Sequence, residues 1–179
     1  IGLRIDNGEN ARTGGAMVRN IRIDHLRVSG TRSQGLETYG VDGLRVGRVD
    51  ASNTGESGVL LNRTIHAEIG VVHCEDCATI RDGYAAFRIA NEAGLIDGDW
   101  PAGNIHVAEV YARAGGRGIF AVSGSGGLTI DRIDIADTGR NAILLQTCGN
   151  TLIAAESGRV ANGEILLTND TANTNSGRY

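Results

Sequence analysis

Three charged residues, Glu37, Asp82 and Arg88, are of types that can cleave a polysaccharide. Two carboxylates about 5–10 Å apart across a glycosidic bond can hydrolyse it. Cleavage by elimination, the reaction of a lyase, needs a cation that neutralises the sugar carboxylate and a base that removes the proton next to it. Arg88, or Ca²⁺ held by carboxylates, would be that cation. We predict these three residues as catalytic candidates, with Ca²⁺ as an optional cofactor and no metal-binding residues assigned. The alternative is that Glu37 and Arg88 are solvated surface charges.

Further residues near these candidates suit sugar binding, namely Tyr39, Asn62, Arg63, Tyr84 and Trp100. Aromatic rings offer a large apolar face beside a polar group, which is what a sugar ring requires. Trp100, in the loop Gly-Asp-Trp-Pro-Ala-Gly, is the strongest candidate for a stacking platform. The alternatives are that Trp100 anchors its own loop and that the tyrosines contribute only to packing.

A repeated strand pattern must position these residues. Residues 127–145 read GLTIDRIDIADTGRNAILL, with three short runs of alternating apolar side chains, and alternation with a period of two is typical of β-strands. The first strands recur every 23 residues, apart from one insertion of 15, at Ile21, Leu44, Ala67, Ile105, Leu128 and Thr151. A period of 20–50 residues indicates a solenoid. Three strands per repeat and no helical pattern predict an all-β, parallel β-solenoid of about six coils.

The repeat also sets the predicted domain limits. We expect one domain over residues 1–170 and a polar C-terminal tail over residues 171–179. Residues 2–5 already read as the third strand of a coil, so the chain begins in mid-coil. We therefore expect that an N-terminal part is missing, or that another domain or a second subunit covers this end.

The outward positions differ between strands. First strands expose Arg22, Arg45, Glu68 and His106, which we interpret as a solvated charged face. Third strands instead present Glu37, Leu60, Arg88, Phe120, Leu144 and Leu166. Apolar residues there predict that the C-terminal half of this face is covered, by the tail, a further domain or a second subunit. Insertions at residues 6–20, 74–86 and 90–104 flank the same face, which is why the site is expected there.

Composition argues against some partners and does not decide the state of the three cysteines. A net charge of −4 argues against nucleic acid as a partner, and no apolar run is long enough to span a membrane. The four histidines lack metal-ligand spacing. For Cys74, Cys77 and Cys148 three readings remain: buried thiols, a Cys74–Cys77 disulfide, or a metal site completed by His73.

The repeats resemble a known group of proteins. The segments NIRIDHLRVSGTRSQGLET, DGLRVGRVDASNTGESGVLL and GLTIDRIDIADTGRNAILL are similar to coils of right-handed parallel β-helix proteins of the pectate-lyase-like superfamily, over about residues 19–170. Ile23-Asp24-His25 resembles part of a Trp-Ile-Asp-His segment of pectate lyases. The motifs of polygalacturonases, pectin methylesterases and alginate epimerases are absent, so no subfamily is assigned.

This resemblance implies a function for the chain. The expected protein is secreted and carbohydrate-active, a polysaccharide lyase or a glycoside hydrolase acting on an acidic, uronate-containing polysaccharide. The alternative is a non-catalytic, polysaccharide-binding or structural β-helix segment of a larger secreted protein.

Overall fold

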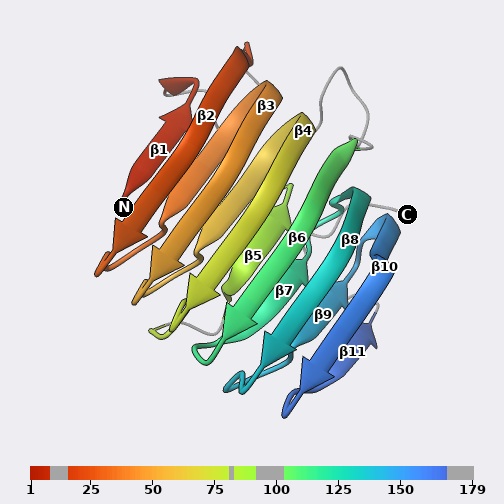
Figure 1. Cartoon of the computed structure of the whole chain (residues 1–179). Helices are drawn as coiled ribbons and strands as arrows, with labels where there is room; N and C mark the ends of the chain where they lie inside the picture. The colour runs from red at the N-terminus through yellow and green to blue at the C-terminus, as the bar shows by residue number, and fades with distance from the viewer. Residues whose placement is uncertain (9–15, 81–82, 92–102, 169–179) are drawn as a thin grey trace.

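The structure, a computed structural model, describes residues 1–8, 16–80, 83–91 and 103–168. These residues form eleven strands that pair in parallel, and none of them lies in an α-helix (Figure 1). The strands are β1 (Leu3–Asp6), β2 (Val18–Ser29), β3 (Leu36–Ser52), β4 (Val59–Glu75), β5 (Ala85–Ala90), β6 (Ile105–Arg113), β7 (Arg117–Ala121), β8 (Gly126–Ala136), β9 (Ile143–Gln146), β10 (Gly149–Ala161) and β11 (Ile165–Thr168). The described residues contain no helix long and apolar enough to cross a membrane.

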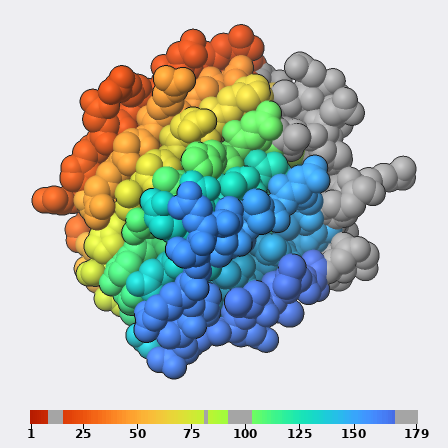
Figure 2. Space-filling view, turned by 45° about the vertical axis from the view of Figure 1, so that its right-hand side comes forward, coloured from red at the N-terminus to blue at the C-terminus, as the bar shows by residue number. Residues whose placement is uncertain are grey.

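The predicted parallel β-solenoid of about six coils is confirmed. Leu36 pairs with Val59, and Leu44 pairs with Ala67, so neighbouring coils are offset by the 23-residue period. Strands β2, β6, β8 and β10 and the C-terminal parts of β3 and β4 lie in one layer, and the shorter strands lie behind them with the first residues of β3 and β4 (Figure 1). In the space-filling view the coils follow one another as bands from red to blue (Figure 2).

Each coil has three faces, named here by the residues that form them. The first-strand face contains residues 21–23, 44–46, 67–69, 105–107, 128–130 and 151–153. The second-strand face contains residues 26–28, 49–51, 72–74, 110–112, 133–135 and 158–160. The third-strand face contains residues 3–6, 36–39, 59–62, 87–90, 119–121, 143–146 and 165–168.

Residues with a left-handed backbone conformation (positive φ) form the corners between the faces. One column with positive φ precedes the first-strand face: Asn20, Gly43, His66, Asn104, Gly127 and Asn150. Another follows the second-strand face: Gly30, Asn53, Asp76, Ala114, Asp137 and Asn162. Gly and Asn occupy this region most readily, Gly because it lacks a Cβ atom and Asn through local hydrogen bonds of its side chain. Each repeat therefore conserves the positive-φ corner positions as well as the apolar inward positions.

The inward residues pack into one column. The core runs the length of the stack and includes fully buried residues such as Leu44, Val49, Phe87 and Ile130. Each buried aliphatic side chain contributes about 1.5–3 kcal/mol to folding, so the stacking of apolar rows is the main force that holds the coils together.

A second apolar cluster lies on the outer side of the third-strand face. Its residues are Leu60, Ala85, Ala90, Phe120, Val122 and Leu144. The prediction that the apolar part of this face is covered is confirmed for Leu60, Phe120 and Leu144, of which no more than 6% is exposed. Leu166 is 39% exposed, so its predicted cover by a further domain or a second subunit stays a prediction. Leu166 belongs to the last described strand, β11, which pairs with β9 on one side.

Candidate functional site

Two of the three predicted catalytic residues, Glu37 and Arg88, lie on the third-strand face. Glu37, Leu60 and Arg88 occupy the same register position on β3, β4 and β5. Adjacent strands are about 4.8 Å apart, so Leu60 separates the Glu37 backbone from the Arg88 backbone by about 10 Å. Asp82 and Trp100 lie outside the described residues. Glu37 and Arg88 therefore share one face, two strands apart, and the predicted pairing of Glu37 with Asp82 lies outside the described residues.

Glu37 sits in a largely buried polar environment. Its residue is 4% exposed, and an oxygen of its carboxylate lies 3.6 Å from Nη1 of Arg4. The Arg4 guanidinium also lies 5.2 Å from the centre of the Tyr39 ring. Burial raises the pKa of Glu37; the Arg4 charge opposes this effect, and the Glu56 charge adds to it. Arg4 and Glu56 were not predicted as neighbours of Glu37, because the pairing of strands across coils brings them close to it.

Arg88 is packed between aromatic rings. Its guanidinium carbon lies 5.3 Å from the centre of the Tyr84 ring and 5.4 Å from that of Phe120. Arg88 is 7% exposed, and two predicted sugar-binding residues, Asn62 and Arg63, are 0% and 4% exposed. These side chains thus form a packed polar and aromatic layer. Their predicted role in binding substrate stays a prediction.

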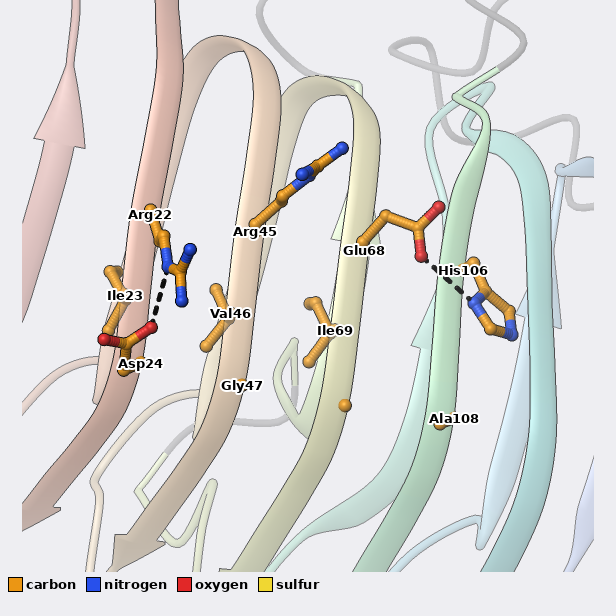
Figure 3. A pocket seen from close by; sticks show the side chains of 11 residues that line it. Arg22, Ile23, Asp24, Arg45, Val46, Gly47, Glu68, Ile69, His106 and Ala108 are labelled. Atoms are coloured by element: carbon orange, nitrogen blue, oxygen red, sulfur yellow. Dashed lines mark hydrogen bonds and ion pairs between the residues drawn. The ribbon is translucent and has the colours of Figure 1, made fainter.

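An open groove lies instead on the first-strand face. It has a volume of about 570 Å³ and crosses β2, β3, β4 and β6 (Figure 3). Arg22, Arg45, Glu68 and His106 follow one another across it, each in register with the next. The alternation of the first strands predicted these four residues as exposed, but as a solvated face without a groove.

Two glycines and an alanine keep this groove shallow and open. Gly47, Gly70 and Ala108 line it next to the charged row. A Cβ atom on Gly47 would lie 2.4 Å from the carbonyl oxygen of Asp24, and one on Gly70 would lie 2.3 Å from that of Gly47. The coils approach so closely here that a side chain has no room. The Gly-x₂₂-Gly spacing was the signal in the sequence that could have revealed the groove.

A second groove adjoins the first at the corner. It has a volume of about 580 Å³ and is lined by Asn20, Gly43, His66 and Asn104, the column of left-handed residues that precedes the first strands. Arg22, Arg45 and Glu68 line both grooves. The two grooves therefore share a charged border, and together they offer amide, imidazole, guanidinium and carboxylate groups.

Most charges of this border are already paired. Arg22 Nε lies 2.8 Å from Asp24 Oδ1, and the Glu68 carboxylate lies 3.4 Å from Nδ1 of His106 (Figure 3). His106 Nε2 is also 2.8 Å from Asp131 Oδ2. These hydrogen bonds, the one with Asp131 first, raise the pKa of His106 despite its partial burial. Arg45 differs from its neighbours: it is exposed and makes no ion pair or hydrogen bond with any residue that the structure describes.

The second-strand face carries a paired network. Asp50 accepts hydrogen bonds from Arg48, and it contacts His25 at 2.6 Å and His73 at 3.2 Å. The Arg48 hydrogen bond is the main cause of the strongly lowered pKa of Asp50, and the one with His25 adds to it. His73 also lies against Tyr111, with ring centres 4.5 Å apart. No group of three or more His, Cys, Asp or Glu residues in the described ranges is arranged to hold a metal ion.

Comparison with known proteins adds no relative from which a role could be transferred. No protein-family model matches the chain, and no curated protein or solved structure matches it significantly. The parallel β-solenoid is established by the strand pairing alone, and fold does not determine function.

Proposed function

We propose that this protein is a polysaccharide-binding β-helix that takes an acidic, uronate-containing chain along the first-strand face. The observation that carries the proposal is Arg45, an exposed cation without an ion-pair partner among the described residues, at the border of two open grooves. A guanidinium binds a carboxylate through two parallel hydrogen bonds, which suits the acid group of a uronate.

The shape of the grooves supports a long ligand. They cross four adjacent strands, and at about 4.8 Å per strand the charged row is on the order of 15 Å long. An extended polymer can follow such a row, whereas an enclosed pocket would suit a small molecule better. Asn20, His66 and Asn104 provide donors and acceptors for hydroxyl groups beside Arg45.

The proposal includes a family and a location. The repeat resembles the pectate-lyase-like superfamily, whose members include proteins that act on uronate polymers. A protein that binds such polymers in a cell wall or matrix would be secreted. Both statements rest on the resemblance of the repeat and on the presence of Arg45 in an open groove.

A second candidate function is catalysis at the third-strand face, as a lyase or a glycoside hydrolase. Glu37 favours it, since burial raises its pKa and a carboxylic acid with a raised pKa is what a general acid requires. Against it stand the burial of Glu37 and the position of Leu60 between Glu37 and Arg88. Binding without catalysis is therefore the function that the geometry supports best.

A panel of polysaccharides separates these functions. The protein is incubated with uronate polymers and with neutral polymers, with and without calcium, and both binding and chain cleavage are measured. We expect binding to the uronate polymers alone, without new reducing ends and without the absorbance of an unsaturated uronate. New reducing ends without that absorbance would indicate a hydrolase, the absorbance would indicate a lyase, and equal binding to neutral polymers would contradict the role of Arg45.

A further inference from the structure

Two thiols meet in the core at the end of β4. Cys74 is 1% exposed and Cys77 is 2% exposed. A Cβ atom on Gly58 would lie 2.3 Å from Sγ of Cys74 and 3.2 Å from Sγ of Cys77. Both sulfur atoms therefore flank the same point, and the glycine of the adjacent turn leaves the room that they occupy.

The two thiols have different surroundings. Cys74 lies 3.5 Å from the carbonyl oxygen of Ala86, and Cys77 lies 3.6 Å from that of Ala51. The hydrogen bond between the two thiols lowers the pKa of Cys77. The same bond and burial raise the pKa of Cys74 well above its usual range. Because the thiolate is the reactive form, Cys77 is the better nucleophile of the pair.

Cys77 lies beneath a short surface turn. Its neighbour Asp76 is exposed, and Ile80 is 61% exposed. The turn is held by the hydrogen bond from Ala78 N to Glu56 O at 2.8 Å and by that from Thr79 N to Thr54 O at 3.2 Å. On the other side, Cys77 O accepts a hydrogen bond from Gly116 N at 2.8 Å, so a reagent reaches Cys77 only when a local opening breaks bonds to a neighbouring coil.

We propose that Cys74 and Cys77 form a disulfide within the folded solenoid by exchange with a low-molecular-weight disulfide such as oxidised glutathione. The Cys77 thiolate attacks one sulfur of glutathione disulfide, and one glutathione leaves as thiolate. Cys74 then gives up its proton to solvent, and its sulfur displaces the second glutathione from Cys77. The two protein thiols are oxidised, and one glutathione disulfide is reduced to two thiols.

The disulfide would act on the turn more than on the whole fold. It closes a very short loop, so it removes little freedom from the unfolded chain. It ties the turn that carries Asp76 and Ala78 to the end of β4, and it therefore opposes the local opening that exposes Cys77. Hydrogen exchange of the Ala78 and Thr79 amides should slow on oxidation, while exchange in the core strands stays unchanged.

Mass spectrometry of the full chain tests the proposal. The folded protein is treated with oxidised glutathione, acid-quenched, unfolded and alkylated. We expect a loss of about 2 Da, for two hydrogens, and one remaining thiol that alkylates, at Cys148. The matched control Cys148→Ser should show the same loss. Cys74→Ala should retain one glutathione on Cys77, because no second thiol can displace it.

The outcomes are distinct. Three alkylated cysteines in the treated wild type would overturn the proposal, and so would a disulfide that includes Cys148. A disulfide that forms only after unfolding would overturn it as well, since it would show that the folded turn does not bring the thiols into reach. The wild-type measurement decides the matter even where a cysteine variant fails to fold.

Discussion

Arg45 and Glu68 lie side by side on β3 and β4, at one register position, yet their side chains form no ion pair. The Glu68 carboxylate turns instead toward His106, on the next strand, at 3.4 Å (Figure 3). Asp24, the other nearby acid, is engaged by Arg22. Because the neighbouring acids already have partners, the Arg45 guanidinium has no ion-pair partner among the described residues, which is the basis of the proposed binding of an acidic ligand.

The hydrogen bonds of His106 predict a pH dependence of stability. They raise the pKa of His106, so the folded state holds the proton more tightly than the unfolded state does. The stabilisation is complete below the unfolded pKa of about 6.5 and is lost as the pH rises through the raised folded value. We expect the urea midpoint of the wild type to fall between pH 6 and 8 relative to that of His106→Asn. A difference between the two that does not change with pH would contradict this account.

The close approach of the coils at Gly47 predicts that a methyl group added there lowers the stability of the fold. Gly47→Ala would place a Cβ atom 2.4 Å from the carbonyl oxygen of Asp24, and backbone on both sides must then shift. We expect a loss of about 1–3 kcal/mol in the free energy of unfolding, measured by urea denaturation. Gly149→Ala is the matched control, since nothing lies within 4 Å of its Cβ position. Equal stability of the two variants would show that the gap between these coils is wider than described.

The fold could be predicted in detail from the sequence because every coil repeats the same physical demand. Inward positions such as Leu44 and Ala67 must be apolar, and corners such as Asn20 and Gly43 must tolerate positive φ. These demands recur every 23 residues, so each coil confirms the register of the next.

The site could be predicted much less well, because it depends on which side chains meet across coils. Alternation places Glu37, Leu60 and Arg88 on one face in this order, but it does not reveal that Glu37 and Arg88 are themselves buried. For Arg45 the difficulty is the opposite one: its exposure could be predicted, but its lack of an ion-pair partner could not. A charge on an outward position looks like solvated surface, and only the pairing of Glu68 with His106 distinguishes it.

The environment of Glu37 gives a further prediction. Burial raises its pKa, so the folded state favours the protonated carboxyl group, and stability is lost as the pH rises through the folded value. Glu37→Gln keeps the shape and removes the titration. We therefore expect this variant to gain stability relative to the wild type as the pH rises from about 4 to 8, measured by urea midpoints. A constant difference across this range would mean that Glu37 is well solvated.

The proposed binding role predicts that uronate polymers bind without being cut, in the wild type and in Glu37→Gln alike. Retained binding in this variant would support separate faces for binding and for the buried carboxyl group. Cleavage by the wild type that disappears in Glu37→Gln would move the function to the third-strand face and would favour the enzyme.

The affinity of Arg45→Ala for a uronate polymer tests the central claim most directly. A hydrogen-bonded charge contributes about 1.5–3 kcal/mol, so we expect titration calorimetry to show at least about tenfold weaker binding than in the wild type. Arg27→Ala is the control, since Arg27 is also exposed and unpaired among the described residues but lies on the second-strand face. Unchanged affinity in Arg27→Ala with weakened affinity in Arg45→Ala is the predicted result. Equal affinity of Arg45→Ala and the wild type, or an equal loss in both variants, would contradict a binding site on the first-strand face.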